Sequence, residues 1–105
     1  MRLRRETGDM PDEEIQLMAT CSDALAHPAR IRIFRHIMAC NKKLQKVCNK
    51  DLVHHFDYAQ ATISQHVKKL VAADLVEVKK EDRFTYYYVN IGRLMEYVNV
   101  TKKFG

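Results

Sequence analysis

The chain of 105 residues contains no tryptophan, three glycines, two prolines and an odd number of cysteines. The glycines stand at positions 8, 92 and 105, so the tight turns between residues 9 and 91 must be made without glycine. The three cysteines, Cys21, Cys40 and Cys48, are far apart in the sequence, which argues against a disulfide framework. We therefore expect one apolar core, in one domain, to hold the fold together.

Long apolar runs are also missing. No hydrophobic segment approaches the length of a membrane span, and residues 1–9 lack the apolar stretch of a signal peptide. We therefore expect a cytoplasmic protein without a membrane partner. The sequence offers no Ser-His-Asp set, no paired catalytic carboxylates and no phosphate-binding glycine loop, so we expect neither an enzyme nor a cofactor. The net charge of +5 fits a nucleic-acid partner but is also common among soluble proteins.

Apolar residues recur at helical spacing through the first part of the chain. They predict helices over 11–27, 28–40, 49–56 and 59–73. The second of these should be the central core helix, because it is apolar on two sides, with Ile31, Phe34 and Met38 on one face and Ile33 and Ile37 on another. Residues 44–47 alternate in polarity and predict a short edge strand. Cys48 then takes the N-cap position of the next helix, three residues before Asp51.

The remaining residues predict a β-hairpin and a final helix. Residues 75–79 alternate in polarity and residues 83–89 are rich in aromatic side chains, with Glu81 and Asp82 at the turn. Asn90 should cap the last helix. The expected fold is mainly α (α+β), a winged helix-turn-helix with about five helices and a two-stranded β-hairpin wing. It should occupy residues 10–103, after a flexible basic arm at 1–9.

The helix over 59–73 carries a polar outer face opposite its apolar stripe. Small polar side chains near its start suit base edges in the major groove, and the lysines one turn further suit phosphates. A basic hairpin would reach the DNA backbone or the minor groove. We therefore expect double-stranded operator DNA as the partner, although a solvated helix face and turn would also explain these residues. The expected DNA-binding residues are Gln60, Thr62, Ser64, Gln65, His66, Lys68, Lys69 and Arg83.

The segments LAHPARIRIF, ATISQHVKKL and DLVEVKKEDRFTYYYV resemble the ArsR/SmtB family of bacterial winged-helix repressors, over about residues 24–90. The resemblance implies a homodimer that binds operator DNA and in many members releases it when an inducer binds. Two glycines that are common in the family, at the helix-turn-helix and at the wing turn, are replaced here by Asp57 and Asp82. Aspartate tolerates the left-handed backbone conformation, so both turns should still form.

The metal sites of the family do not carry over. Its arsenic and cadmium sensors have a Cys-x-Cys-Asp motif, whereas this chain has Cys48, Asn49, Lys50 and Asp51 in sequence. One thiolate cannot supply the three or four soft ligands of such a site. The last helix offers only Glu96 where the zinc sensors have Asp and His ligands. We therefore expect no metal site, and the inducer is not identified.

Two further expectations concern thiol chemistry and assembly. Cys48, at a helix N-terminus between Lys46 and Lys50, is the best candidate for a redox-sensitive thiol. Surplus apolar residues on the first and last helices predict a homodimer through these helices. The residues are Ile15, Met18 and Leu25 on the first helix and Leu94, Met95 and Val98 on the last. A protein-interaction module without specific DNA binding is the alternative function.

Overall fold

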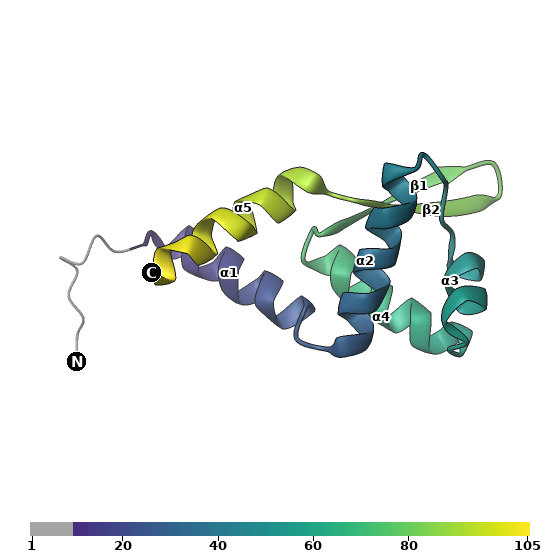
Figure 1. Ribbon diagram of the computed structural model, residues 1–105, viewed down its shortest axis with the longest axis horizontal. Coiled ribbons are helices and arrows are strands. Elements are labelled where there is room, and N and C mark those ends of the chain that lie inside the picture. Colours follow the sequence, from purple (N-terminus) through teal and green to yellow (C-terminus); the bar gives the residue numbers. More distant parts are fainter. Residues whose placement is uncertain (1–9) are drawn as a thin grey trace.

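The computed structural model describes residues 10–105, which form five α-helices, one two-stranded antiparallel sheet and a short 3-10 helix (Figure 1). The predicted mainly α winged-helix fold is confirmed. The predicted arm at 1–9 lies outside the described residues. In chain order the elements are α1 (Asp12–Ala24), α2 (Pro28–Lys42), α3 (Asn49–Phe56), α4 (Gln60–Ala72), β1 (Val76–Glu81), β2 (Phe84–Val89), α5 (Ile91–Thr101) and η2 (Lys102–Phe104).

The elements gather at two ends of the molecule. α1 and α5 lie side by side at one end, while α2, α3, α4 and the β1–β2 hairpin pack together at the other (Figure 1). α2 contacts both α4 and β2, so one helix supports the helix-turn-helix and the hairpin together. The core of this second end is apolar, and no polar or charged residue within 10–105 is buried. Its largest fully buried side chains are Ile33, Ile37, Leu52, Ile63, Leu70 and Leu75.

The central position of α2 is confirmed, but one of its predicted core residues is wrong. The buried residues of α2 include Ala29, Ile33 and Ile37, which recur every four positions along one face. Phe34 is buried beside them, whereas Ile31 is 43% exposed. Ile31 is two residues from both Ala29 and Ile33, so the helical period places its side chain on the opposite side of α2, away from the core.

Within residues 10–105, four non-glycine residues have a positive φ angle, and each of them lies in a turn. Asp57 (φ 58°) joins α3 to α4, and Asp82 (φ 56°) lies in the hairpin turn, as predicted. Asp74 (φ 63°) follows α4, and Leu44 (φ 60°) follows α2. Leucine has no polar group to offset the cost of this conformation, and the Leu44 side chain is 93% exposed.

The predicted edge strand at 44–47 is wrong. The connector between α2 and α3, residues 43–48, forms a single β-bridge, between Cys48 and Tyr86. α2 continues to Lys42, and the left-handed Leu44 then turns the chain, so too few extended residues remain for a ladder. The connector nevertheless runs along β2, because the Tyr87 N–H donates to the Val47 carbonyl oxygen at 2.8 Å.

The hairpin is longer on its first strand than predicted. β1 runs to Glu81, which pairs with Phe84, so the turn consists of Asp82 and Arg83. The two strands are in antiparallel register from Val76 opposite Val89 to this turn. Arg83 therefore lies at the tip of the hairpin. We call the whole hairpin, β1 and β2 with their turn, the wing.

Candidate nucleic-acid interface

The polar residues of α4, apart from His66, are exposed to solvent. α4 buries Ile63, Val67 and Leu70 and thereby fixes which of its side chains face outward. Six of the predicted DNA-binding residues are exposed on this helix, and we call this set the outer face of α4. Its members are Gln60, Thr62, Ser64, Gln65, Lys68 and Lys69.

The start of α4 has no side-chain cap. Asp57 has the left-handed conformation that ends α3, and Ala59 occupies the N-cap position of α4 without a side-chain hydrogen bond. Alanine cannot satisfy the first N–H groups of the helix as serine would. These groups lie next to Gln60 and Thr62 and remain available to an anionic group such as a phosphate.

His66 differs from the rest of the predicted set, because it is half-buried between α4 and the start of α2. Its ring centroid lies 4.8 Å from that of His27, which caps α2 by accepting a hydrogen bond from the Ala29 N–H. Burial lowers the pKa of His66, and the nearby His27 and Arg30 lower it further. His66 therefore supports the packing of α4 against the start of α2 and does not belong to the outer face of α4.

The wing carries three cations near its tip, beside the acidic residues Glu81 and Asp82. Arg83 lies in the turn, and Lys79 and Lys80 near the end of β1 are exposed as well. The Lys79 ammonium lies 5.7 Å from the centroid of the Tyr88 ring. A cation held over an aromatic face keeps its charge and loses some freedom, so Arg83 and Lys80 are the less restrained cations of the wing.

The wing is braced from the connector. The Lys46 ammonium forms an ion pair with Glu81 and lies 5.2 Å from the centroid of the Tyr86 ring. At the base of the hairpin, the Tyr87 hydroxyl donates to Asn49 Oδ1 at 3.4 Å. Tyr87 is the buried member of the tyrosine run, so the hairpin is held to the domain on both faces.

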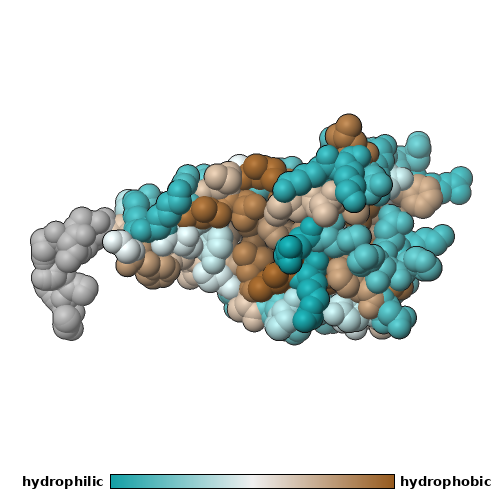
Figure 2. All heavy atoms as spheres, viewed as in Figure 1, coloured by the Kyte–Doolittle hydropathy of each residue, from teal (hydrophilic) through white to brown (hydrophobic). Residues whose placement is uncertain are grey.

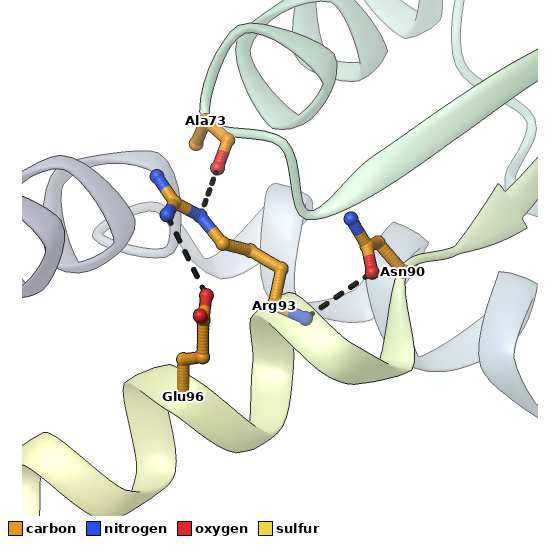
Figure 3. Close-up of polar contacts among 4 residues, drawn as sticks. All are labelled: Ala73, Asn90, Arg93 and Glu96. Carbon is orange, nitrogen blue, oxygen red and sulfur yellow. Dashed lines mark hydrogen bonds and ion pairs between the residues drawn. The ribbon is translucent and has the colours of Figure 1, made fainter.

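Arg93, which the sequence did not single out, joins α5 to the end of α4 (Figure 3). Its Nε donates to the carbonyl oxygen of Ala73 at 3.1 Å, and its guanidinium pairs with Glu96 at 3.7 Å. The Asn90 side chain accepts from the Arg93 backbone N–H at 3.1 Å, so the predicted cap is confirmed. An arginine in the first turn of a helix is unfavourable for the helix dipole, and this was the only signal in the sequence.

The three cysteines have different surroundings. Cys21 is fully buried, and burial raises the pKa of its thiol despite the opposing effect of Arg93. Cys40 is half-buried, with its Sγ 3.5 Å from His36 Nε2.

Cys48 caps α3 together with Asp51, so the predicted capping box is confirmed. The Cys48 backbone N–H and thiol both donate to the Asp51 carboxylate, at 2.9 and 3.3 Å. The neighbouring Lys46 is paired with Glu81 instead. Within residues 10–105, no group of three or more His, Cys, Asp or Glu side chains is arranged to hold a metal ion.

Exposed apolar side chains gather on α5, where Figure 2 shows a hydrophobic surface. Ile91, Met95 and Val98 of α5 and Ile15 of α1 are exposed. The prediction that Leu25 and Leu94 belong to this surface is wrong, because both pack against the core. They lie at the ends of α1 and α5 that adjoin α4, where the domain itself covers them. No helix in the described part of the chain is long and apolar enough to cross a membrane.

Comparisons with known proteins agree with this architecture. A family model described as a helix-turn-helix domain matches residues 25–79. The arsenical resistance operon repressor of Staphylococcus xylosus is 30% identical over 82 residues, which cover 78% of this chain and 73% of the repressor.

Solved structures give the same result. An ArsR-like transcriptional regulator from Rhodococcus sp. RHA1 is similar with a TM-score of 0.76 at 20% identity, covering 87% of this chain and 81% of that one. A possible transcriptional regulator for arsenical resistance is similar with a TM-score of 0.65 at 27% identity, covering 78% and 80%. The chain therefore belongs to the ArsR/SmtB family of winged-helix regulators and is a DNA-binding transcriptional regulator, not an enzyme.

Proposed function

We propose that this regulator is a cytoplasmic homodimeric repressor that reads operator DNA with the outer face of α4 in the major groove. The observation that carries the proposal is the exposure of all six polar residues of that face on a helix whose other side is fully packed. Such a helix presents its side chains to a groove without losing core contacts. Residues 10–103 then act as one domain for DNA binding and dimerisation.

The residues of the interface divide into two roles. Gln60 and Gln65 carry amides that can pair with adenine, and Thr62 and Ser64 reach bases or phosphates. Lys68, Lys69 and Arg83 add affinity through phosphates, and Arg83 does so from the wing. His66 contributes at the edge of the outer face, by supporting α4 against His27.

The dimer forms through α1 and α5. Ile15, Ile91, Met95 and Val98 give this end an apolar surface that one chain does not cover. A two-fold axis at this end would bring the apolar surfaces of two chains together. It would also present two copies of α4 to successive major grooves. An operator with two symmetric half-sites about one DNA turn apart is the expected target.

The stretch from Cys48 to Asp51 does not offer the ligand set of a thiolate metal site, and the inducer is not identified. In the stretch from Cys48 to Asp51 a single thiol is available, and it donates to the Asp51 carboxylate. An oxidant that acts on Cys48 is an alternative to a metal ion as the signal that releases the operator. The Cys48 thiol caps α3, the helix that precedes α4, so its oxidation would disturb the helix-turn-helix. Release of the operator on oxidation, reversal by a thiol reductant and insensitivity of Cys48→Ser would support it; an unchanged response in Cys48→Ser would exclude it.

Selection of bound DNA from a random pool tests the proposal. We expect a symmetric consensus sequence, bound with a steep dependence on salt concentration. Gln65→Ala should weaken binding to the consensus more than binding to scrambled DNA of the same length. A pool without enrichment, and with binding independent of salt, would favour the alternative of a protein-interaction module.

A further inference from the structure

The outer edge of β2 is not paired with a third strand. Within the described residues the sheet consists of β1 and β2 alone, and β1 occupies one edge of β2. The backbone groups of Tyr87 and Val89 that point to the other edge would otherwise lack partners. Unpaired N–H and C=O groups at a half-buried edge are costly, so the domain must supply acceptors and donors there.

Asn41, in the last turn of α2, supplies one acceptor and one donor to this edge of β2. Its side-chain Oδ1 accepts from the Val89 N–H at 2.8 Å, and its Nδ2 donates to the Tyr87 carbonyl oxygen at 3.4 Å. The Val47 carbonyl oxygen accepts from the Tyr87 N–H at 2.8 Å. The Asn41 amide therefore replaces one peptide unit of the missing strand, with the donor and acceptor that a peptide would offer.

This anchor acts on the wing at the end opposite its tip. Val89 ends β2, and Arg83 precedes its first residue, so about six residues separate the anchor from the tip. At about 3.3 Å per residue the lever is about 20 Å long, and a tilt of about 10° at the base moves the tip by about 3 Å. A shift of that size breaks a hydrogen bond to a phosphate.

We propose that Asn41 is a positioning residue for DNA binding, which sets the angle of the wing relative to the outer face of α4. α2 packs against α4 as well as β2, so an anchor on α2 fixes the position of the wing relative to α4. Asn41 touches no DNA in this arrangement and acts through Arg83. The inference rests on the proposed contact between Arg83 and DNA.

A double-mutant cycle distinguishes positioning from a general structural role. Asn41→Ala should weaken binding to the selected operator by about tenfold, because coupled residues commonly change affinity by this amount. In an Arg83→Ala background the same substitution should cost less than about twofold, since the contact it positions is already lost. In a Gln65→Ala background it should again cost about tenfold, because α4 is not involved.

Gln45→Ala is the matched control. Gln45 is an exposed amide in the connector, four residues after Asn41. It should bind operator DNA like the parent protein. If Asn41→Ala does not fold, Asn41→Asp carries the same cycle, because it keeps an acceptor for the Val89 N–H, loses the donor to the Tyr87 carbonyl oxygen and adds a negative charge beside that oxygen.

Two results would overturn the inference and are distinguishable. Equal losses for the Asn41 variant with and without Arg83 would show a role unrelated to the wing, while the proposed reading of DNA by α4 and Arg83 would stand. No loss for Arg83→Ala itself, with a clear loss for Gln65→Ala, would remove the wing contact from the proposed function and Asn41 with it.

Discussion

The Nε of Arg93 donates to the carbonyl oxygen of Ala73, at 3.1 Å, and so ties the first turn of α5 to the end of the reading helix α4. Ala73 is the C-cap of α4, where carbonyl groups have no partner within the helix. A cationic donor at that point satisfies one of them and also complements the negative end of the helix dipole. α4 is therefore fixed at its C-terminal end by the helix proposed to form the dimer.

Arg93→Ala should lower the free energy of unfolding by about 1–3 kcal/mol, because it leaves a half-buried carbonyl group without its donor. Urea unfolding measures the change. Glu96→Gln is the control: the carboxylate of Glu96 is largely exposed and 3.7 Å from Arg93, so its loss should cost at most about 0.5 kcal/mol. Equal effects of the two substitutions would mean that the ion pair, and not the bond to Ala73, is what stabilises this junction.

Leu44→Gly should raise the free energy of unfolding by about 0.5–1 kcal/mol. Glycine removes the strain of a leucine at φ 60°, and the exposed side chain gives up no burial. The gain is smaller than the strain because glycine also adds entropy to the unfolded chain. The neighbouring Lys43, at φ −93°, provides the opposite case, and Lys43→Gly should destabilise the protein. Thermal unfolding of the two variants and the parent protein measures both changes.

These residues show where reasoning from the sequence succeeds and where it ends. The outer face of α4 could be predicted because the helical period assigns Ile63, Val67 and Leu70 to one side, and so the polar residues to the other. The turns at Asp57 and Asp82 could be predicted because few residue types accept a positive φ. Leu44 could not, since its residue type gives no sign of the conformation.

The anchors at Asn41 and Arg93 could not be predicted either, for a different reason. Both side chains bond to backbone atoms of elements distant in the sequence, Tyr87 and Val89 for one and Ala73 for the other. Every residue offers similar backbone groups, so no pattern in the sequence marks such a partner. Only the packing of α2 on β2 and of α5 near α4 brings these groups together.

A negative charge on the apolar surface of α5 should dissociate the proposed dimer. Met95→Glu and Val98→Glu place carboxylates where two apolar surfaces would meet, and burying an unpaired charge there is costly. Sedimentation velocity should show a dimer for the parent protein and a monomer for both variants. Val78→Glu changes an equally apolar exposed residue of β1 and should leave the dimer intact. A parent protein that is monomeric at micromolar concentration would contradict the assembly.

Stability should fall as the solution becomes mildly acidic, in part through His66. Burial, with the neighbouring His27 and Arg30, lowers the pKa of His66 in the folded state. The unfolded chain therefore binds more protons, so the stabilisation is present above about pH 6.5 and is lost as pH falls through the folded-state pKa. We expect the difference in Tm between about pH 7.5 and about pH 5.5 to be smaller for His66→Gln than for the parent protein. His54→Gln, at an exposed histidine of α3, should retain the full difference.

The salt dependence of binding should identify the phosphate contacts of α4. Lys68→Ala should weaken binding to all DNA sequences alike, because a charge on a phosphate carries no sequence information. The slope of log affinity against log salt concentration should become shallower by about one per lysine removed, and hence by about two in a homodimer. Lys102→Ala removes an equally exposed lysine from η2, at the other end of the molecule, and should leave the slope unchanged. If both variants changed the slope alike, the lysines would act through net charge alone, and the outer face of α4 would lose its assigned contact with phosphate.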